Sequence, residues 1–126
     1  MHNVHKNIRL LESTTTYPIV LYIEAKKNSI AQITEYFRYV DKLIDGHKFH
    51  YIIDLSDTNP PSTEVRILLK KKLQDLDSKI VSYSVIIGSN YLLKIALKFV
   101  GSSVGLINFK TYKSVEDAVK FIENGN

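Results

Sequence analysis

The chain has 126 residues, of which 44% are hydrophobic and 24% are charged. This length fits one ordinary domain, and the balance is that of a globular protein rather than a disordered or fibrous one. Cysteine is absent from the chain, which excludes disulfides, thiolate metal sites and cysteine nucleophiles and fits a reducing compartment. We therefore expect a single domain over residues 1–126.

The amino-terminal sequence and the charge limit where the protein works and what it binds. Residues 1–6 lack an apolar signal core, and no apolar run approaches the roughly 18 residues that span a bilayer. We expect a cytoplasmic protein that is not transmembrane. The net charge is +4, and the basic cluster Lys70–Lys72 lies in a helix that also carries Asp75 and Asp77, so we expect no nucleic-acid surface.

The first elements are a hairpin and a helix. Residues 4–11 and 17–25 are predicted to be strands because apolar side chains alternate along the second of them. Ser29 and Gln32 have the spacing of a capping box, and apolar residues then recur at helical spacing until Gly46.

Strands and helices alternate through the rest of the chain. The apolar run 49–55 is typical of a strand covered on both faces, and a helix with an apolar stripe from Val65 to Leu76 follows the Pro-Pro pair. A strand is predicted over residues 80–87, and a helix capped by Ser89 or Asn90 is predicted to run to about residue 100.

The predicted series ends with a strand over residues 104–109 and a helix that begins at Ser114 and ends near Gly125. The order is β-β-α-β-α-β-α-β-α. Because such alternation places helices over a sheet through right-handed crossovers, we predict an α/β fold with a mixed, mainly parallel five-stranded sheet and four helices.

Three segments carry a resemblance to a known family. They are residues 53–56 (Ile-Asp-Leu-Ser), 92–99 and 112–122, together with the polar turn that follows the first of them. In this arrangement the chain resembles the STAS domain family, and within it the single-domain bacterial proteins grouped with the anti-sigma factor antagonists (SpoIIAA-like). The resemblance covers the chain from about residue 20 onward.

The resemblance implies a non-enzymatic module that binds another protein and is controlled by phosphorylation of a hydroxyl before the second helix. The family's turn usually reads Asp-Ser-Ser-Gly, whereas residues 61–65 read Pro-Ser-Thr-Glu-Val. The glycine is absent, Ser62 and Thr63 are the candidate acceptors, and Glu64 could occupy the acceptor position itself. Some members of the broader fold group bind apolar small molecules, which keeps a second hypothesis open.

The residues around this turn can also be interpreted without the family resemblance. Asp54, Ser56 and Asp57 follow a predicted parallel strand, at the edge where α/β proteins place ligands. Ser62 can cap the next helix by accepting from the free amides of its first turn. The same amides could also donate to a phosphate. Our candidate interaction or regulatory residues are Asp54, Ser56, Asp57, Ser62, Thr63, Ser89, Asn90, Lys94 and Lys98.

The helix predicted after residue 90 has an unusually wide apolar surface. Lys94 and Lys98 are its only charges over residues 91–100, one turn apart. Either another element of the fold covers this helix completely, or part of its apolar surface contacts a partner protein, a second copy of the chain or a lipid. The candidate apolar surface consists of Leu92, Leu93, Ala96 and Leu97.

The sequence shows no recognisable catalytic machinery. Residues 101–105 match the letters G-x-S-x-G, but they pass from helix to strand, the reverse of a nucleophile elbow. Two histidine pairs, at residues 2 and 5 and at residues 47 and 50, are poor metal ligands because one pair is terminal and the other flanks a strand. We expect no catalytic residue, metal or cofactor; an aspartate mechanism at Asp54 and Asp57 is the remaining enzyme alternative.

The leading hypothesis is therefore a non-enzymatic, STAS-like protein-interaction domain with signalling function. Its partner would be another protein or a second copy of the chain. The alternative is a small module that binds an apolar ligand or lipid between the helix predicted after residue 90 and the sheet.

Overall fold

A computed structural model describes residues 7–24, 29–56, 62–88 and 109–125. In these residues one sheet has the strands β1 (Ile8–Leu11), β2 (Ile19–Ile23), β3 (Phe49–Asp54), β4 (Ile80–Ile86) and β5 (Phe109–Tyr112), which lie in chain order. β1 pairs antiparallel with β2, and every other neighbouring pair is parallel. The helices are α1 (Ile30–Ile44), α2 (Thr63–Leu76), a short 3-10 turn η1 (Asp77–Lys79) and α4 (Val115–Asn124).

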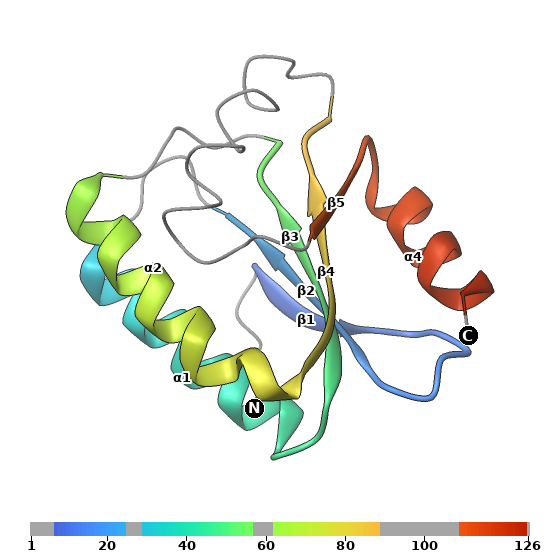
Figure 1. Cartoon of the computed structure of the whole chain (residues 1–126), viewed down its shortest axis with the longest axis horizontal. Coiled ribbons are helices and arrows are strands. Elements are labelled where there is room, and N and C mark those ends of the chain that lie inside the picture. Colours follow the sequence, from blue (N-terminus) through green and yellow to red (C-terminus); the bar gives the residue numbers. More distant parts are fainter. Residues whose placement is uncertain (1–6, 25–28, 57–61, 89–108, 126) are drawn as a thin grey trace.

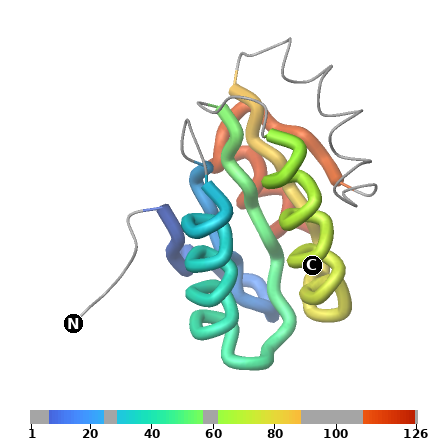
Figure 2. Tube along the Cα trace, turned by 90° about the vertical axis from the view of Figure 1, so that its left-hand side faces the viewer, coloured from blue at the N-terminus to red at the C-terminus, as the bar shows by residue number. Residues whose placement is uncertain are grey.

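The helices cover the sheet from both sides. α1 and α2 lie on one face and α4 lies on the other (Figure 1). Seen from the side of the helical pair, α1 and α2 run next to each other in front of the sheet (Figure 2). The predicted α/β class and the mixed, mainly parallel five-stranded sheet are confirmed, as are three of the four predicted helices. The fourth, predicted after residue 90, lies outside the described residues.

The prediction for the end of the last strand was wrong. β5 runs from Phe109 to Tyr112, whereas the prediction ended the strand at Phe109; residues 104–108 lie outside the described part of the chain. The apolar run was taken as the strand, but β5 lies at the edge of the sheet. Polar residues such as Lys110 and Thr111 are common there, because an edge strand is not buried on all sides.

α1 begins at the predicted capping box. The Ser29 hydroxyl accepts a hydrogen bond from the Gln32 amide at 3.1 Å, and the Gln32 side chain accepts from the Ser29 amide at 3.2 Å. The helix ends at Ile44, and the capping residue Asp45 has a left-handed backbone (φ 46°), followed by Gly46 at φ 81°. Two free amides at the start of the helix are thereby satisfied, and the chain turns sharply into β3.

The sheet separates two cores. Side chains at alternating positions of β2 and β3 point to opposite faces, so that Tyr51 packs beneath α1 and α2 while Ile52 packs beneath α4. The hairpin between β1 and β2 also contacts the far end of α4, because the Thr14 amide donates to Glu123 Oε2 at 3.2 Å. The core beneath α4 contains Ile19, Leu21, Ile52, Ile86, Ala118 and Ile122.

The central position of Ile52 leads to a stability prediction. Its side chain is fully buried beneath α4, so Ile52→Ala should lower the free energy of unfolding by about 2–5 kcal/mol through lost burial and a cavity. The control is Ile67→Ala in α2, where the side chain is 67% exposed and the change should stay within about 0.5 kcal/mol. Equilibrium unfolding in urea measures the change in unfolding free energy for both variants. Equal changes would contradict the assignment of Ile52 to the core.

Candidate functional site

Three strands end together at one edge of the sheet. The Glu24 amide, just after β2, donates to the Asp54 carbonyl at 2.9 Å, and the Leu55 amide donates to the Ile86 carbonyl at 2.9 Å. The parallel ladder thus continues slightly past the strand ends. We call the residues that follow β2, β3 and β4 at this end, Glu24, Asp54–Ser56 and Gly88, the carboxyl edge.

A tight polar turn follows β3. Asp54 Oδ1 accepts from the Ser56 amide at 2.9 Å and from the Ser56 hydroxyl at 2.6 Å. Gly88 lies against this turn with φ +59°, and a Cβ placed on it would lie 3.2 Å from Ser56 Cβ. The close approach and the positive φ both favour glycine at position 88. The Asp54 side chain therefore holds the turn while Ser56 remains exposed.

The amino end of α2 carries the candidate hydroxyl groups. The Ser62 hydroxyl accepts from the Val65 amide at 3.3 Å, which confirms it as the cap of the helix. The Thr63 hydroxyl accepts from the Arg66 guanidinium at 3.1 Å. Ser62, Thr63 and Glu64 are all exposed. The amino end of α2 lies at the same end of the molecule as the carboxyl ends of β3 and β4 (Figure 1).

The structure describes some of the residues predicted to form the interaction surface. Asp54, Ser56, Ser62 and Thr63 are described, and the hydrogen bonds join Asp54 directly to Ser56. The expected convergence with Ser89 stays a prediction, as does the wide apolar surface. Outside the described residues lie Asp57, Ser89, Asn90, Lys94 and Lys98, and also Leu92, Leu93, Ala96 and Leu97.

A buried carboxylate next to a tyrosine was missed by the sequence analysis. Glu24 is buried at the end of β2, and its Oε1 accepts from the Tyr22 hydroxyl at 2.8 Å. Burial raises the pKa of Tyr22 far above its usual value, and the neighbouring Glu24 charge raises it further. Burial also raises the pKa of Tyr51. Both phenols therefore stay neutral, and the Tyr22 hydroxyl holds the Glu24 carboxylate in place.

The described residues contain no group of three or more His, Cys, Asp and Glu side chains that could hold a metal ion. His47 is exposed at the turn before β3, whereas His50 is buried within the strand. The two side chains are thus in different environments. Among helices that the structure describes, none has the length and apolar character needed to cross a membrane.

The similarity of this chain to known proteins lies in its fold. A solved structure of an uncharacterised protein of the DUF3478 family, from Shewanella loihica PV-4 and described as having a SpoIIAA-like fold, matches with a TM-score of 0.72 and 15% sequence identity. The match covers 97% of this chain and 98% of the other. This chain has a SpoIIAA-like fold. The STAS-like resemblance of the sequence is confirmed at the level of the fold.

No family model matches the sequence, and no curated protein matches it. At 15% identity the match to the solved structure establishes the architecture alone. The activity and the partner of this SpoIIAA-like chain therefore have to be argued from its own residues.

The helix cap leads to a prediction for Ser62. Removing the hydroxyl with Ser62→Ala leaves the Val65 amide without its partner, so the free energy of unfolding should fall by about 1 kcal/mol. Ser78→Ala is a matched control, because Ser78 is an exposed serine at the other end of the same helical segment. Urea unfolding should separate the two variants; an unchanged S62A would contradict the capping role.

The buried phenol of Tyr22 leads to a prediction about alkaline pH. Tyr22 keeps its proton in the folded state at a pH where the unfolded chain, with an ordinary tyrosine pKa of about 10, loses it. Its contribution to stability is thus complete below pH 10 and is lost as the pH rises further. Tyr22→Phe should reduce the slope of unfolding free energy against pH above 10 by up to about 1.4 kcal/mol per pH unit. Urea unfolding at several pH values compares the slopes, and equal slopes would contradict the prediction.

Proposed function

We propose that this protein is a non-enzymatic regulatory domain that binds another protein through the carboxyl edge and the amino end of α2. The observation that carries the proposal is the group of exposed hydroxyl side chains at this end, Ser56, Ser62 and Thr63. All three take part in local hydrogen bonds, Ser56 with Asp54, Ser62 with the Val65 amide and Thr63 with the Arg66 guanidinium. A surface held in this way is preorganised for a partner, which lowers the entropy cost of association.

The bonding at Asp54 supports binding rather than catalysis. One carboxylate oxygen accepts from both the amide and the hydroxyl of Ser56, the arrangement of an Asx turn. A carboxylate used in this way shapes the backbone after β3. We therefore assign Asp54 to the support of the surface and Ser56 to contact with the partner.

The position of Ser62 supports control by a charge change. Its hydroxyl lies at the first turn of a 14-residue helix, where free amides and the helix dipole favour an anion. Phosphate on Ser62 or Thr63 would add about −1.5 to −2 charges at this surface. Glu64 already contributes a negative charge in the same turn. Because Arg66 places a positive charge beside Thr63, a modification would shift the local charge balance toward negative and alter the affinity for a charged partner.

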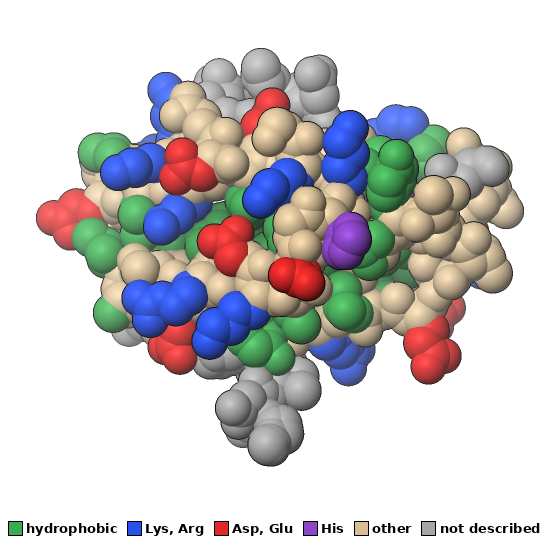
Figure 3. Space-filling model, turned by 90° about the horizontal axis from the view of Figure 1, so that it is seen from below, with side chains coloured by type: hydrophobic (Ala, Val, Ile, Leu, Met, Phe, Trp, Pro, Cys, Tyr) green, Lys and Arg blue, Asp and Glu red, His purple; other side chains and the backbone are tan. Residues whose placement is uncertain are grey.

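The opposite end of the molecule provides a reference surface. Lys and Arg side chains are interspersed with Asp and Glu side chains there (Figure 3). Such a mixture produces no extended field of one sign. The short turn η1, which contains Ser78, follows α2 at this end (Figure 1). Ser78 is exposed like Ser56.

A matched pair of substitutions tests the proposal. Ser56→Arg places a large cation at the carboxyl edge, and Ser78→Arg places the same group at the opposite end. After affinity capture from the source cells and identification of the bound protein, its purified form is titrated by calorimetry. S56R should raise the Kd at least tenfold, whereas S78R should leave the Kd within about twofold of the wild type.

Equal Kd values for wild type, S56R and S78R would reject the carboxyl edge as the binding surface. Circular dichroism of both variants before the titration distinguishes lost contact from lost folding.

A further inference from the structure

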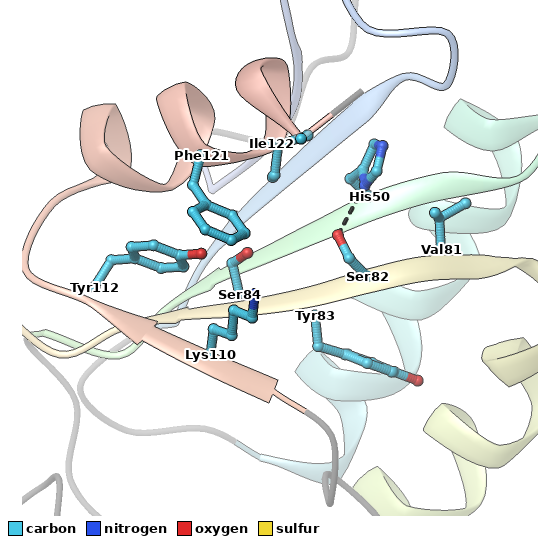
Figure 4. A pocket seen from close by; sticks show the side chains of 10 residues that line it. His50, Val81, Ser82, Tyr83, Ser84, Lys110, Tyr112, Phe121 and Ile122 are labelled. Atoms are coloured by element: carbon cyan, nitrogen blue, oxygen red, sulfur yellow. Dashed lines mark hydrogen bonds between the residues drawn. The ribbon is translucent and has the colours of Figure 1, made fainter.

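α4 covers its face of the sheet only in part. Branched apolar side chains of β2 and β3, together with Ile86 at the end of β4, pack with Ala118 and Ile122 of α4. Earlier along β4 the same face carries Ser82 and Ser84, and β5 adds Lys110 and Tyr112; a groove of about 340 Å³ lies between these residues and α4. Figure 4 shows these side chains around the groove, with the strands below and α4 along one side.

The floor of the groove is formed by small hydroxyl side chains. Ser82 and Ser84 are two residues apart on β4 and so point to the same face of the sheet. β3, the next strand, has Ile52 opposite Ser84 in the register. A face used only for packing would carry large apolar side chains throughout. The serines instead leave room for a small molecule above the sheet.

His50 orients the hydroxyl of Ser82. The two side chains are joined by a hydrogen bond of 2.7 Å between His50 Nδ1 and Ser82 Oγ. His50 Nε2 is buried and has no hydrogen-bond partner among the described residues. Because a buried N–H without an acceptor is rarer than an unused acceptor, we assign the ring proton to Nδ1. Burial lowers the pKa of His50 and keeps the ring neutral. Ser82 then accepts from His50 and is free to donate its own proton elsewhere.

Lys110 supplies a positive charge at the same place. Its Nζ lies 3.9 Å from the centroid of the Phe121 ring, and it projects from β5 beside Ser84 in the register. The described residues that line the groove include no Asp or Glu. Lys110 therefore meets an aromatic face rather than a carboxylate, and its charge is available to an anion.

The walls of the groove are apolar. Phe121 and Val81 are 49% and 43% exposed, which is high for such side chains. The Phe121 ring also lies 5.9 Å from the Tyr112 ring, and Tyr112 and Ser84 line the same groove. A flat group could thus pack on Phe121 while its polar end reaches the strands.

We propose that this groove binds a small organic carboxylate with a flat apolar body. The carboxylate meets the Lys110 ammonium and the Ser82 hydroxyl, and the body lies against Phe121 and Val81. A volume of about 340 Å³ is at the lower end of the range for ligand pockets, about 300–1,000 Å³. This suits a metabolite-sized ligand rather than a peptide. The site is separate from the carboxyl edge proposed as the protein-binding surface.

The test is a titration of the isotope-labelled protein with benzoate, followed by NMR. Benzoate should shift the amide signals of Ser82, Ser84, Lys110 and Phe121 in a saturable manner, with a Kd in the millimolar range or below. Benzamide has the same shape without the charge and should bind at least tenfold more weakly, because a charge-assisted hydrogen bond is lost. Octanoate has the charge without the flat ring and should also bind more weakly than benzoate.

Substitutions at two lysines complete the test. Lys110→Met keeps the apolar stem and removes the charge, so the Kd for benzoate should rise at least tenfold, with partial recovery in Lys110→Arg. The matched control is Lys113→Met, an exposed lysine that does not line the groove; its Kd should equal that of the wild type.

Several results would overturn the proposal. They are the absence of saturable shifts with benzoate, shifts confined to residues away from the groove, and binding by benzamide or octanoate as tight as that of benzoate. Equal weakening by K110M and K113M would also overturn it. The location of the shifts is read on the wild-type protein and does not depend on whether a variant folds.

Discussion

The parallel pairing of β3 with β2 on one side and β4 on the other is the constraint on which the rest of the structure depends. β3 is buried along most of its length and sends side chains to both cores. Its register positions every neighbouring strand end, and thereby brings Glu24, Asp54 and Gly88 to one edge. If this pairing slipped by one residue, Tyr51 and Ile52 would exchange faces, and both helical layers would lose their contact surface.

The same strand connects the two proposed surfaces. Asp54 ends β3 at the carboxyl edge, while His50 lies near the start of β3 beside the groove under α4. The two sites therefore belong to one rigid element but lie on different parts of it. The edge offers exposed hydroxyl groups suited to a large partner, whereas the groove offers a shielded floor and the Lys110 cation, which suit a small one. Different kinds of ligand can thus be assigned to the two sites from their shape and charge.

Local signals in the sequence were sufficient for much of the fold. The capping box at Ser29 and the cap at Ser62 depend on residues three positions apart, and the structure has both. The pairing of His50 with Ser82 could not be read in this way, because it joins residues 32 positions apart across a ladder with a register shift between Phe49 and His50. The alternating serines of β4 were the available signal for the groove. Glu24 was missed for a similar reason, since its burial depends on how the helices cover the sheet.

The contact between Thr14 and Glu123 has a consequence for the order of folding. The two residues are 109 positions apart, and α4 closes the core that β2 and β3 begin. A ribosome must therefore make most of the described chain before that face of the sheet can be covered. Until then Leu21 and Ile52 are open to water and to other nascent chains, and contacts so distant in sequence form slowly. Until α4 is made, the growing polypeptide therefore exposes an apolar strand face of the kind that favours aggregation.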